Sequence, residues 1–238
     1  MKSNKIIFTN VLGVPDVFNP KPSTAYVPDW YKELPGYYNS GQEKKPDGDG
    51  TSSTTVKKCM PLFDATTAGY IISLYADVYV SQREDSKGVK TPWYEWSSFS
   101  PVQFHPAAQA PNYPNRNGHD QYPKWMNPWA IKTPPGYSIL FTQPFHRESV
   151  FTILDGIVDT DRYTPPVNFP FILNDINFEG LIPAGTPIAQ IIPFKRESWK
   201  MEMGSDKEMK EQIDQTSLLR TKFFDSYKTF FRVSKEYR

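Results

Sequence analysis

The sequence predicts a mainly β protein, a sandwich or distorted barrel of about eight to twelve strands with long ordered loops and one C-terminal amphipathic helix. The composition is the first reason: 23 prolines, 14 tyrosines, 16 phenylalanines and 6 tryptophans among 238 residues suit short strands and ordered loops. The second is a pair of apolar runs with strand period at 167–173 and 188–194. The third is a long apolar alternation at 72–80. No fixed repeat is present, so we expect a single β-rich domain rather than a solenoid or propeller.

The paired apolar runs are expected to form two half-buried strands. Odd positions are apolar in the first run, and even positions of the second run share one face that only Gln190 interrupts. An unpaired amide there would cost about 1 to 3 kcal/mol, so we expect Gln190 to be buried and hydrogen-bonded to backbone. Before the second run, a turn is predicted with Pro183 at its second position and Gly185 at its last.

The chain is expected to have four parts. Residues 1–39 hold a first strand and a proline-aromatic arm that wraps a surface, because its prolines cannot complete a hydrogen-bond ladder. Residues 40–58 lack an apolar period and are predicted to form a mobile loop. Residues 59–200 form the β core, and 205–235 the C-terminal helix.

Within the β core, residues 72–80 are predicted to be one long strand, which a hairpin links to a strand carrying Trp93 and Trp96 on the same side. Residues 100–135 are dense in Pro, Asn, His, Tyr and Trp without a period, which indicates a long ordered loop. Further strands are expected near 137–141 and 151–153.

The C-terminal helix is predicted over 206–234, where apolar residues recur at spacings near three and four. Ser205 and Glu208 have the spacing of a capping box at its start. Its apolar face is expected to pack on the sheet, and binding of a partner is the alternative.

Charge and cysteine content narrow the function classes. With 27 Lys and Arg against 26 Asp and Glu, no overall field draws the chain to nucleic acid. Cys59 is the single cysteine, so an internal disulfide is excluded and a cytoplasmic location is expected. No apolar stretch reaches the roughly 18 residues of a membrane span, so no membrane partner is expected.

Two sets of side chains are candidates for chemistry or binding. Histidine is scarce and lacks metal-ligand spacing, so we predict no metal site and name no cofactor. Aromatic rings beside polar residues suit a stacking platform for sugars or bases, although packing against prolines explains such a set equally. The ligand-binding candidates are Trp93, Trp96, Tyr113, Tyr122, Trp125, Trp129, His105 and His119.

A second candidate group consists of Asp159 and Asp161, which flank one threonine, with Tyr163 beside them. On an extended strand the two carboxylates would share a face, where they could bind Mg²⁺ or act as general base. The alternative is that they cap turns and pair with Arg162 or Arg147.

One stretch resembles a known family. Residues 156–163, GIVDTDRY, are similar to the GVIDxDY motif of the dUTPase and dCTP deaminase superfamily, and 187–192, PIAQII, to its RIAQLI strand. Ala68-Gly69-Tyr70 resembles the family's AGYDL segment, although Ile71 stands in place of its aspartate. The resemblance implies a β-clip fold, an Asp159 that orients the catalytic water, and a Tyr163 that stacks on the base.

The layout of the whole chain also resembles an uncharacterised protein family of marine tailed phages and some bacteria. Its matching segments include VPDWYKELP, CMPLFDATTAGY and TPPGYSILF. This resemblance implies no activity, and it places the protein in a host cytoplasm or a virion.

The functional hypotheses therefore remain open, including whether the protein is an enzyme. The leading one is a phage-type β-rich protein that binds a protein or small-molecule ligand through an aromatic loop face, with homo-oligomerisation as an option. The alternative is a nucleotide hydrolase or deaminase that uses Asp159 and Tyr163, and a metal-dependent oxygenase is disfavoured by the histidine pattern.

Overall fold

The computed structural model describes residues 4–37, 54–96, 100–109, 111, 121–221 and 227–238. The chain divides into two compact units. The first comprises Met1–Tyr26, Ala68–Arg196 and Tyr237–Arg238, and the second comprises Val27–Thr67 and Glu197–Glu236. The expected mobile loop at 40–58 lies mostly outside the described residues; its described end contains a short 3-10 helix, Val56–Lys58.

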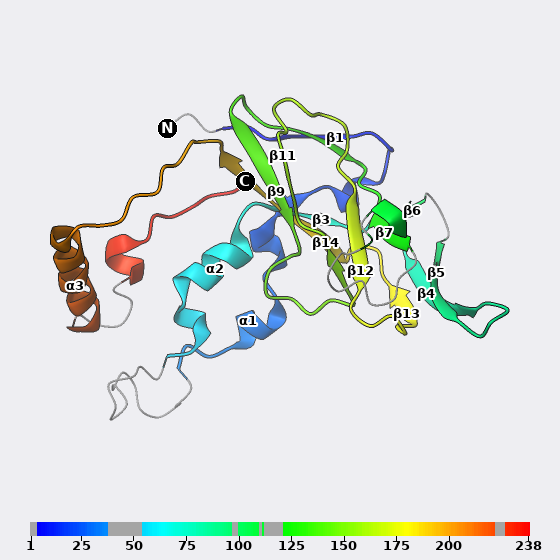
Figure 1. The fold of residues 1–238 in the computed structure, drawn as a ribbon, viewed down its shortest axis with the longest axis horizontal. Coiled ribbons are helices and arrows are strands. Elements are labelled where there is room, and N and C mark those ends of the chain that lie inside the picture. The colour runs from blue at the N-terminus through cyan, green and yellow to red at the C-terminus, as the bar shows by residue number, and fades with distance from the viewer. Residues whose placement is uncertain (1–3, 38–53, 97–99, 110, 112–120, 222–226) are drawn as a thin grey trace. The chain divides into compact units, whose positions relative to one another are not determined.

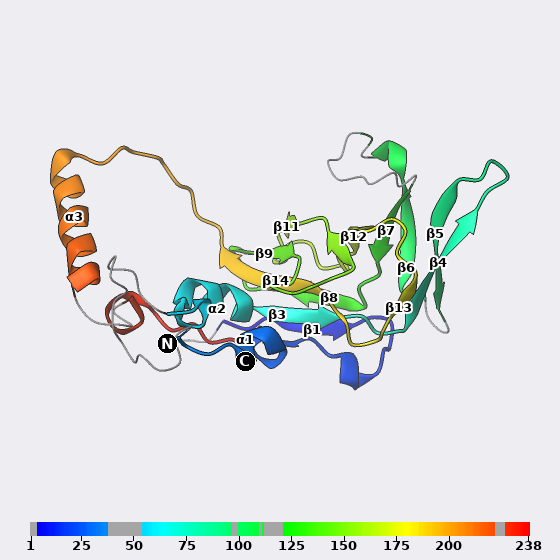
Figure 2. The same cartoon turned by 90° about the horizontal axis from the view of Figure 1, so that it is seen from below.

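The first unit contains every described strand and confirms the mainly β prediction (Figures 1 and 2). Its strands form four sheets, in the orders β1-β8, β10-β12-β7-β6, β11-β9-β14-β3-β2 and β13-β4-β5, and among the described strands none closes into a barrel. The strands are β1 (Ile7–Asn10), β2 (Lys21–Pro22), β3 (Tyr70–Ser73), β4 (Val78–Glu84), β5 (Lys90–Trp96), β6 (Val102–Pro106), β7 (Gln121–Trp125), β8 (Trp129–Lys132), β9 (Tyr137–Thr142), β10 (Phe151–Ile153), β11 (Gly156–Val158), β12 (Phe169–Leu173), β13 (Gly180–Ile182) and β14 (Pro187–Lys195).

The longest strand, β14, is the centre of the five-stranded sheet, with antiparallel partners β9 and β3 on its two edges. It is buried on both faces, from Ile188 through Ile191, rather than half-buried as expected. Gln190 lies in this stretch and confirms its prediction: its Nε2 donates to the Ala68 carbonyl at 2.7 Å, and its Oε1 accepts from Phe145 N at 3.0 Å. A buried amide satisfied on both sides fixes the position of β14 in the sheet.

Aromatic side chains form much of the core of this unit. Trp125 of β7 stacks on Phe171 of β12, with ring centroids 4.1 Å apart and planes 9° from parallel. Phe151 of β10 meets the edge of the same indole at 5.1 Å. Such pairs add to the stabilisation from buried area, so the four-stranded sheet is tied together through this stack.

The single strand predicted at 72–80 is wrong, because the structure divides it between β3 and β4 in different sheets. Leu74 exchanges backbone hydrogen bonds with the 183–186 turn, donating to Thr186 O and accepting from Gly185 N, and the chain bends at residues 75–76. The apolar alternation in the sequence continues through the bend because Leu74 and Ala76, although outside the strands, are also buried in the core.

The predicted hairpin is confirmed as β4–β5, whose register runs from Val78↔Trp96 to Glu84↔Lys90. It projects from the rest of its unit (Figures 1 and 2). The expectation that Trp93 and Trp96 share a side is wrong: they lie three positions apart, and side chains alternate with period two, so they point to opposite faces.

The long loop predicted at 100–135 is also wrong, because it contains strands β6, β7 and β8. The prolines in this stretch hid the strand pattern in the sequence. Pro123 lies within β7, opposite Phe104 of β6, but β12 pairs with β7 only at Lys124 and Trp125, so the missing N–H of Pro123 costs no ladder bond on that side.

The turn before β14 differs in register from its prediction. Thr186 N donates to Pro183 O, so Pro183 opens the turn and Gly185 takes the third position with φ of +88°. A positive φ at that position suits glycine. The turn joins β13 to β14, and β12, which begins at Phe169, belongs to another sheet.

The second unit is helical. It contains α1 (Asp29–Glu33), α2 (Met60–Thr67), α3 (Asp206–Thr221) and a π-helical turn, Tyr227–Phe231. The Tyr31 ring stacks on Phe63 at 6.0 Å, and Asp64 forms ion pairs with Arg232 and Lys235. The ion pairs of Asp64 join its two chain segments. Within the described residues no helix is long and apolar enough to cross a membrane.

The structure describes the C-terminal helix α3 over Asp206–Thr221 and a π-helical turn over Tyr227–Phe231, where one helix was predicted over 206–234. The capping box is confirmed, since Ser205 N donates to Glu208 Oε2 at 2.7 Å. The α3 side chains that the structure describes, at 206–216, are all exposed within this unit.

Candidate functional site

Asp159 and Asp161 lie in a tight turn rather than on an extended strand. β11 ends at Val158, and the carbonyl of Asp159 then accepts from both Arg162 N, at 2.9 Å, and Tyr163 N, at 2.8 Å. The turn follows from the Asp-Thr-Asp sequence, since aspartate favours such positions. The two carboxylates therefore do not line one face of a strand, yet both approach the same cation.

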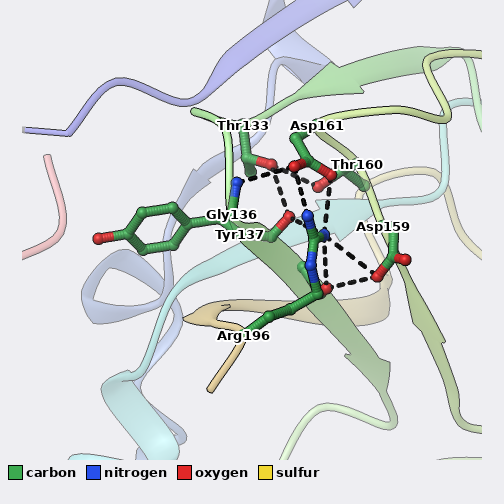
Figure 3. Close-up of polar contacts among 8 residues, drawn as sticks. Thr133, Gly136, Tyr137, Asp159, Thr160, Asp161 and Arg196 are labelled. Carbon is green, nitrogen blue, oxygen red and sulfur yellow. Dashed lines mark hydrogen bonds and ion pairs between the residues drawn. The ribbon is translucent and has the colours of Figure 1, made fainter. Parts of the chain in front are cut away.

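That cation is Arg196, directly after β14 (Figure 3). Its Nη1 donates to Asp161 Oδ1 at 2.8 Å, and its Nη2 donates to Asp161 Oδ2, which gives a bidentate pair. Gly136 N donates to Asp161 Oδ2 at 2.8 Å. The Asp161 side chain is only 7% exposed, so this carboxylate is enclosed by its donors.

Asp159 is held less completely. Its Oδ1 accepts from Ser138 Oγ at 2.6 Å and lies 3.2 Å from Arg196 Nη1, while its side chain is 53% exposed. Between the two aspartates, Thr160 is buried and its hydroxyl meets that of Thr133 at 2.8 Å. The turn is therefore fixed at each of its three residues.

The electrostatics of the cluster favour fixed charges. Hydrogen bonds from Arg196 and Gly136 hold the pKa of Asp161 well below its usual range. The same ion pair raises the pKa of Arg196. A general base needs a pKa near the working pH, and the ion pair with Arg196 keeps the pKa of Asp161 far below that range.

The partner of the aspartates was not predicted. We expected pairing with Arg162 or Arg147, but Arg196 comes from the far end of β14, where Lys195 pairs with Tyr137 of β9. Only the sheet register brings it to the turn, and a single sequence carries no signal for that pairing. Tyr163 follows the turn with half of its surface exposed.

The aromatic ligand-binding candidates do not form one surface. Trp125, Trp129 and Tyr122 are at most 3% exposed and belong to the core, so they cannot stack on a ligand at the surface. This corrects the expectation of a shared aromatic loop face. His105 lies half-buried on β6, and Tyr113 and His119 lie outside the described residues.

An aromatic face does exist on the outer side of the β13-β4-β5 sheet. Leu181 pairs with Tyr79, and Tyr79 with Glu95, while Trp93 pairs with Ser81 two positions along. Directly opposed residues share a face, so we call Tyr79, Arg83, Trp93, Glu95 and Leu181 the hairpin face. Its three apolar members are each about half exposed, at 46% to 54%.

Polar side chains order this face. The Arg83 guanidinium lies over the Trp93 ring, 3.6 Å from its centroid, and its Nη2 lies 3.3 Å from Glu95 Oε1. Stacking on the ring and pairing with the carboxylate restrain the long arginine side chain. Trp96, on the opposite face, is not part of this surface.

No metal centre is assembled in the described part of the chain, where no three His, Cys, Asp or Glu side chains are placed to hold an ion. The two carboxylates at the turn instead both form ion pairs with Arg196.

Comparison with known proteins adds a distant structural likeness. No family model matches the sequence, and no curated protein matches it. Among solved structures, a dUTPase from phage phi11 of S. aureus, described as coordinating a structural Mg(II) ion, is similar with a TM-score of 0.32 and 14% identity. The similarity covers 60% of this chain and 86% of that one.

Proposed function

We propose that this chain is a binding protein that associates with a second copy of itself through the hairpin face. The observation that carries the proposal is the row of exposed Leu181, Tyr79 and Trp93 on one face of a projecting sheet. Tyrosine, tryptophan and arginine are the residues that dominate binding energy at protein interfaces.

The charges of the face support a second copy as the partner. Arg83 and Glu95 lie side by side with the aromatic residues, so the face is neutral overall and carries one charge of each sign. In a two-fold interface the same patch meets itself, and a patch with both signs can place each Arg83 against the Glu95 of the other copy. A partner surface that carries charges of only one sign would complement only one of these two residues.

The hydrolase alternative loses its support in the geometry of the carboxylates. Asp161 is enclosed by Arg196 and Gly136, and Asp159 is bound by Ser138 and Arg196. Asp161 would have to leave its ion pair before it could bind Mg²⁺ or activate water, and the more exposed Asp159 would have to act without a second free carboxylate beside it. We therefore assign the cluster a structural role.

Self-association is tested by sedimentation velocity up to about 100 μM, where an interface of micromolar affinity would be well populated. We expect the wild-type protein to form dimers as its concentration rises, and Trp93→Ser to remain monomeric. Ile157→Ser is the matched control, because Ile157 is also an exposed apolar side chain, at 65%, on a strand of another sheet. A monomeric wild type, or a dimer that Trp93→Ser leaves intact, would overturn the proposal.

The structural role of the cluster is tested by turnover of dUTP and dCTP with magnesium. We expect no turnover above the rate without enzyme for the wild type or for Asp159→Asn, and a lower melting temperature for Asp159→Asn. Turnover by the wild type that Asp159→Asn abolishes, with an unchanged melting temperature, would restore the hydrolase assignment.

A further inference from the structure

A separate feature of the first unit is a cation without a matching anion. Arg147 lies in the loop between β9 and β10, and its Nε and Nη2 are buried without a hydrogen-bond partner. Every arginine N–H is a donor and the charge is permanent, so enclosing these groups without acceptors is unfavourable. Arg147 as a whole is half-buried, but buried polar groups in proteins are normally hydrogen-bonded, so these two nitrogens are an exception that needs a physical cause.

The loop is hydrogen-bonded on both sides of Arg147. Phe145 N donates to Gln190 at 3.0 Å, and after Arg147 the Ser149 carbonyl accepts from Asn174 Nδ2 at 2.7 Å. Between them His146 has φ of +57°, the one positive φ at a non-glycine residue in the described chain. Strained backbone of this kind persists where the surroundings impose it, and it clusters at ligand sites.

None of the ion pairs and hydrogen bonds of the described residues joins the Arg147 guanidinium to a carboxylate. Burial lowers the pKa of Arg147, and the opposing influence comes from the phenol of Tyr26 rather than from an acidic side chain. Tyr26 itself is half-buried and could donate a hydrogen bond to an anion bound beside the guanidinium.

We propose that Arg147 is the centre of a binding site for a small oxyanion, a phosphate or a carboxylate, with Tyr26 as a second donor. The planar guanidinium offers paired N–H groups that match the oxygens of either anion. A bound anion would neutralise the charge and satisfy the two nitrogens at once. Because these nitrogens are closed off from water, the 143–150 loop has to move as the anion enters.

The site is tested on the full chain with inorganic phosphate and with acetate, each against sodium chloride at equal ionic strength. We expect at least one of the two anions to raise the melting temperature and to slow hydrogen exchange of the 143–150 amides. The more effective anion then distinguishes the phosphate from the carboxylate class.

Arg147→Met should remove both effects, and Arg162→Met, which changes an exposed arginine of the same unit, should keep them. If neither anion changes the wild-type protein beyond the chloride control, or if Arg147→Met responds as the wild type does, the site does not exist. Failure of Arg147→Met to fold would be resolved by Arg147→Lys, which keeps the charge but loses the planar pairing and should bind more weakly.

Discussion

Replacing Gln190 with leucine tests how a buried amide holds the central sheet. Gln190 is 1% exposed and joins the Ala68 carbonyl on one side to Phe145 N on the other. In Gln190→Leu the Ala68 carbonyl keeps a donor, because Ser23 Oγ also bonds it at 2.7 Å, whereas Phe145 N loses its acceptor. The cost is therefore dominated by one orphaned N–H, about 1 to 3 kcal/mol.

Part of that cost is offset by the apolar surface of leucine, at about 0.8 kcal/mol for each buried methylene. We expect a net loss of about 1 to 2 kcal/mol in the free energy of unfolding, and at about 2 to 4 °C per kcal/mol the melting temperature should fall by about 2 to 8 °C. Urea denaturation with a constant m-value would show that the native state is the one affected. Gln103→Leu, an exposed glutamine on β6, is the control and should change the free energy by less than about 0.5 kcal/mol.

A double-mutant cycle with Ser23→Ala sharpens the test. Either single change leaves the Ala68 carbonyl one side-chain donor, while the double variant removes both. The double variant should therefore lose about 1 kcal/mol more than the sum of the single losses. Additive losses, or a Gln190→Leu protein as stable as the wild type, would refute the account.

Two further predictions concern the same unit. Gly69→Ala should lower the free energy of unfolding by at least about 3 kcal/mol or prevent folding, because a Cβ there would overlap the Ile191 carbonyl in addition to the strain of φ at +65°. Gly13→Ala, with φ of +69° and open space around it, is the control and should lower it by only about 1 to 2 kcal/mol in the same denaturation assay. Asp161→Asn should lower the melting temperature at pH 7, and the gap to the wild type should narrow as the pH falls below about 4. Folding lowers the pKa of Asp161 through Arg196, so the stabilisation is complete above the unfolded pKa and is lost as the pH falls toward the folded one. A gap that stays constant from pH 7 to pH 3 would contradict this.

The sequence was most informative where a local pattern and burial agree. Gln190 was placed correctly because a lone polar residue among apolar neighbours must find partners wherever its strand lies. The β4–β5 hairpin and the capping box at Ser205 were predicted because both depend on residues close together in the sequence.

What could not be predicted depends on pairing between distant segments. Strand period extended through the bend after β3 because both sides of the bend are buried, and prolines concealed β7 although the sheet accommodates Pro123. The ion pair of Asp161 with Arg196 joins residues 35 positions apart, and only the pairing of β9 with β14 creates it.

The position of that ion pair explains the two carboxylates in the turn without assigning them a catalytic role. Arg196 is the last residue of the second segment of the first unit, and its backbone N donates to Gly136 O at 2.8 Å. Its side chain also bonds the Tyr137 carbonyl at 2.9 Å, so the β9–β14 ladder ends in a cluster of charge-assisted bonds. Three residues later Trp199 is 87% exposed. The last backbone groups of a strand need hydrogen-bond partners where the strand ends. Arg196 provides them at the end of β14, and Asp161 holds the Arg196 side chain in place. This role is a sufficient physical reason for an acidic turn at this position.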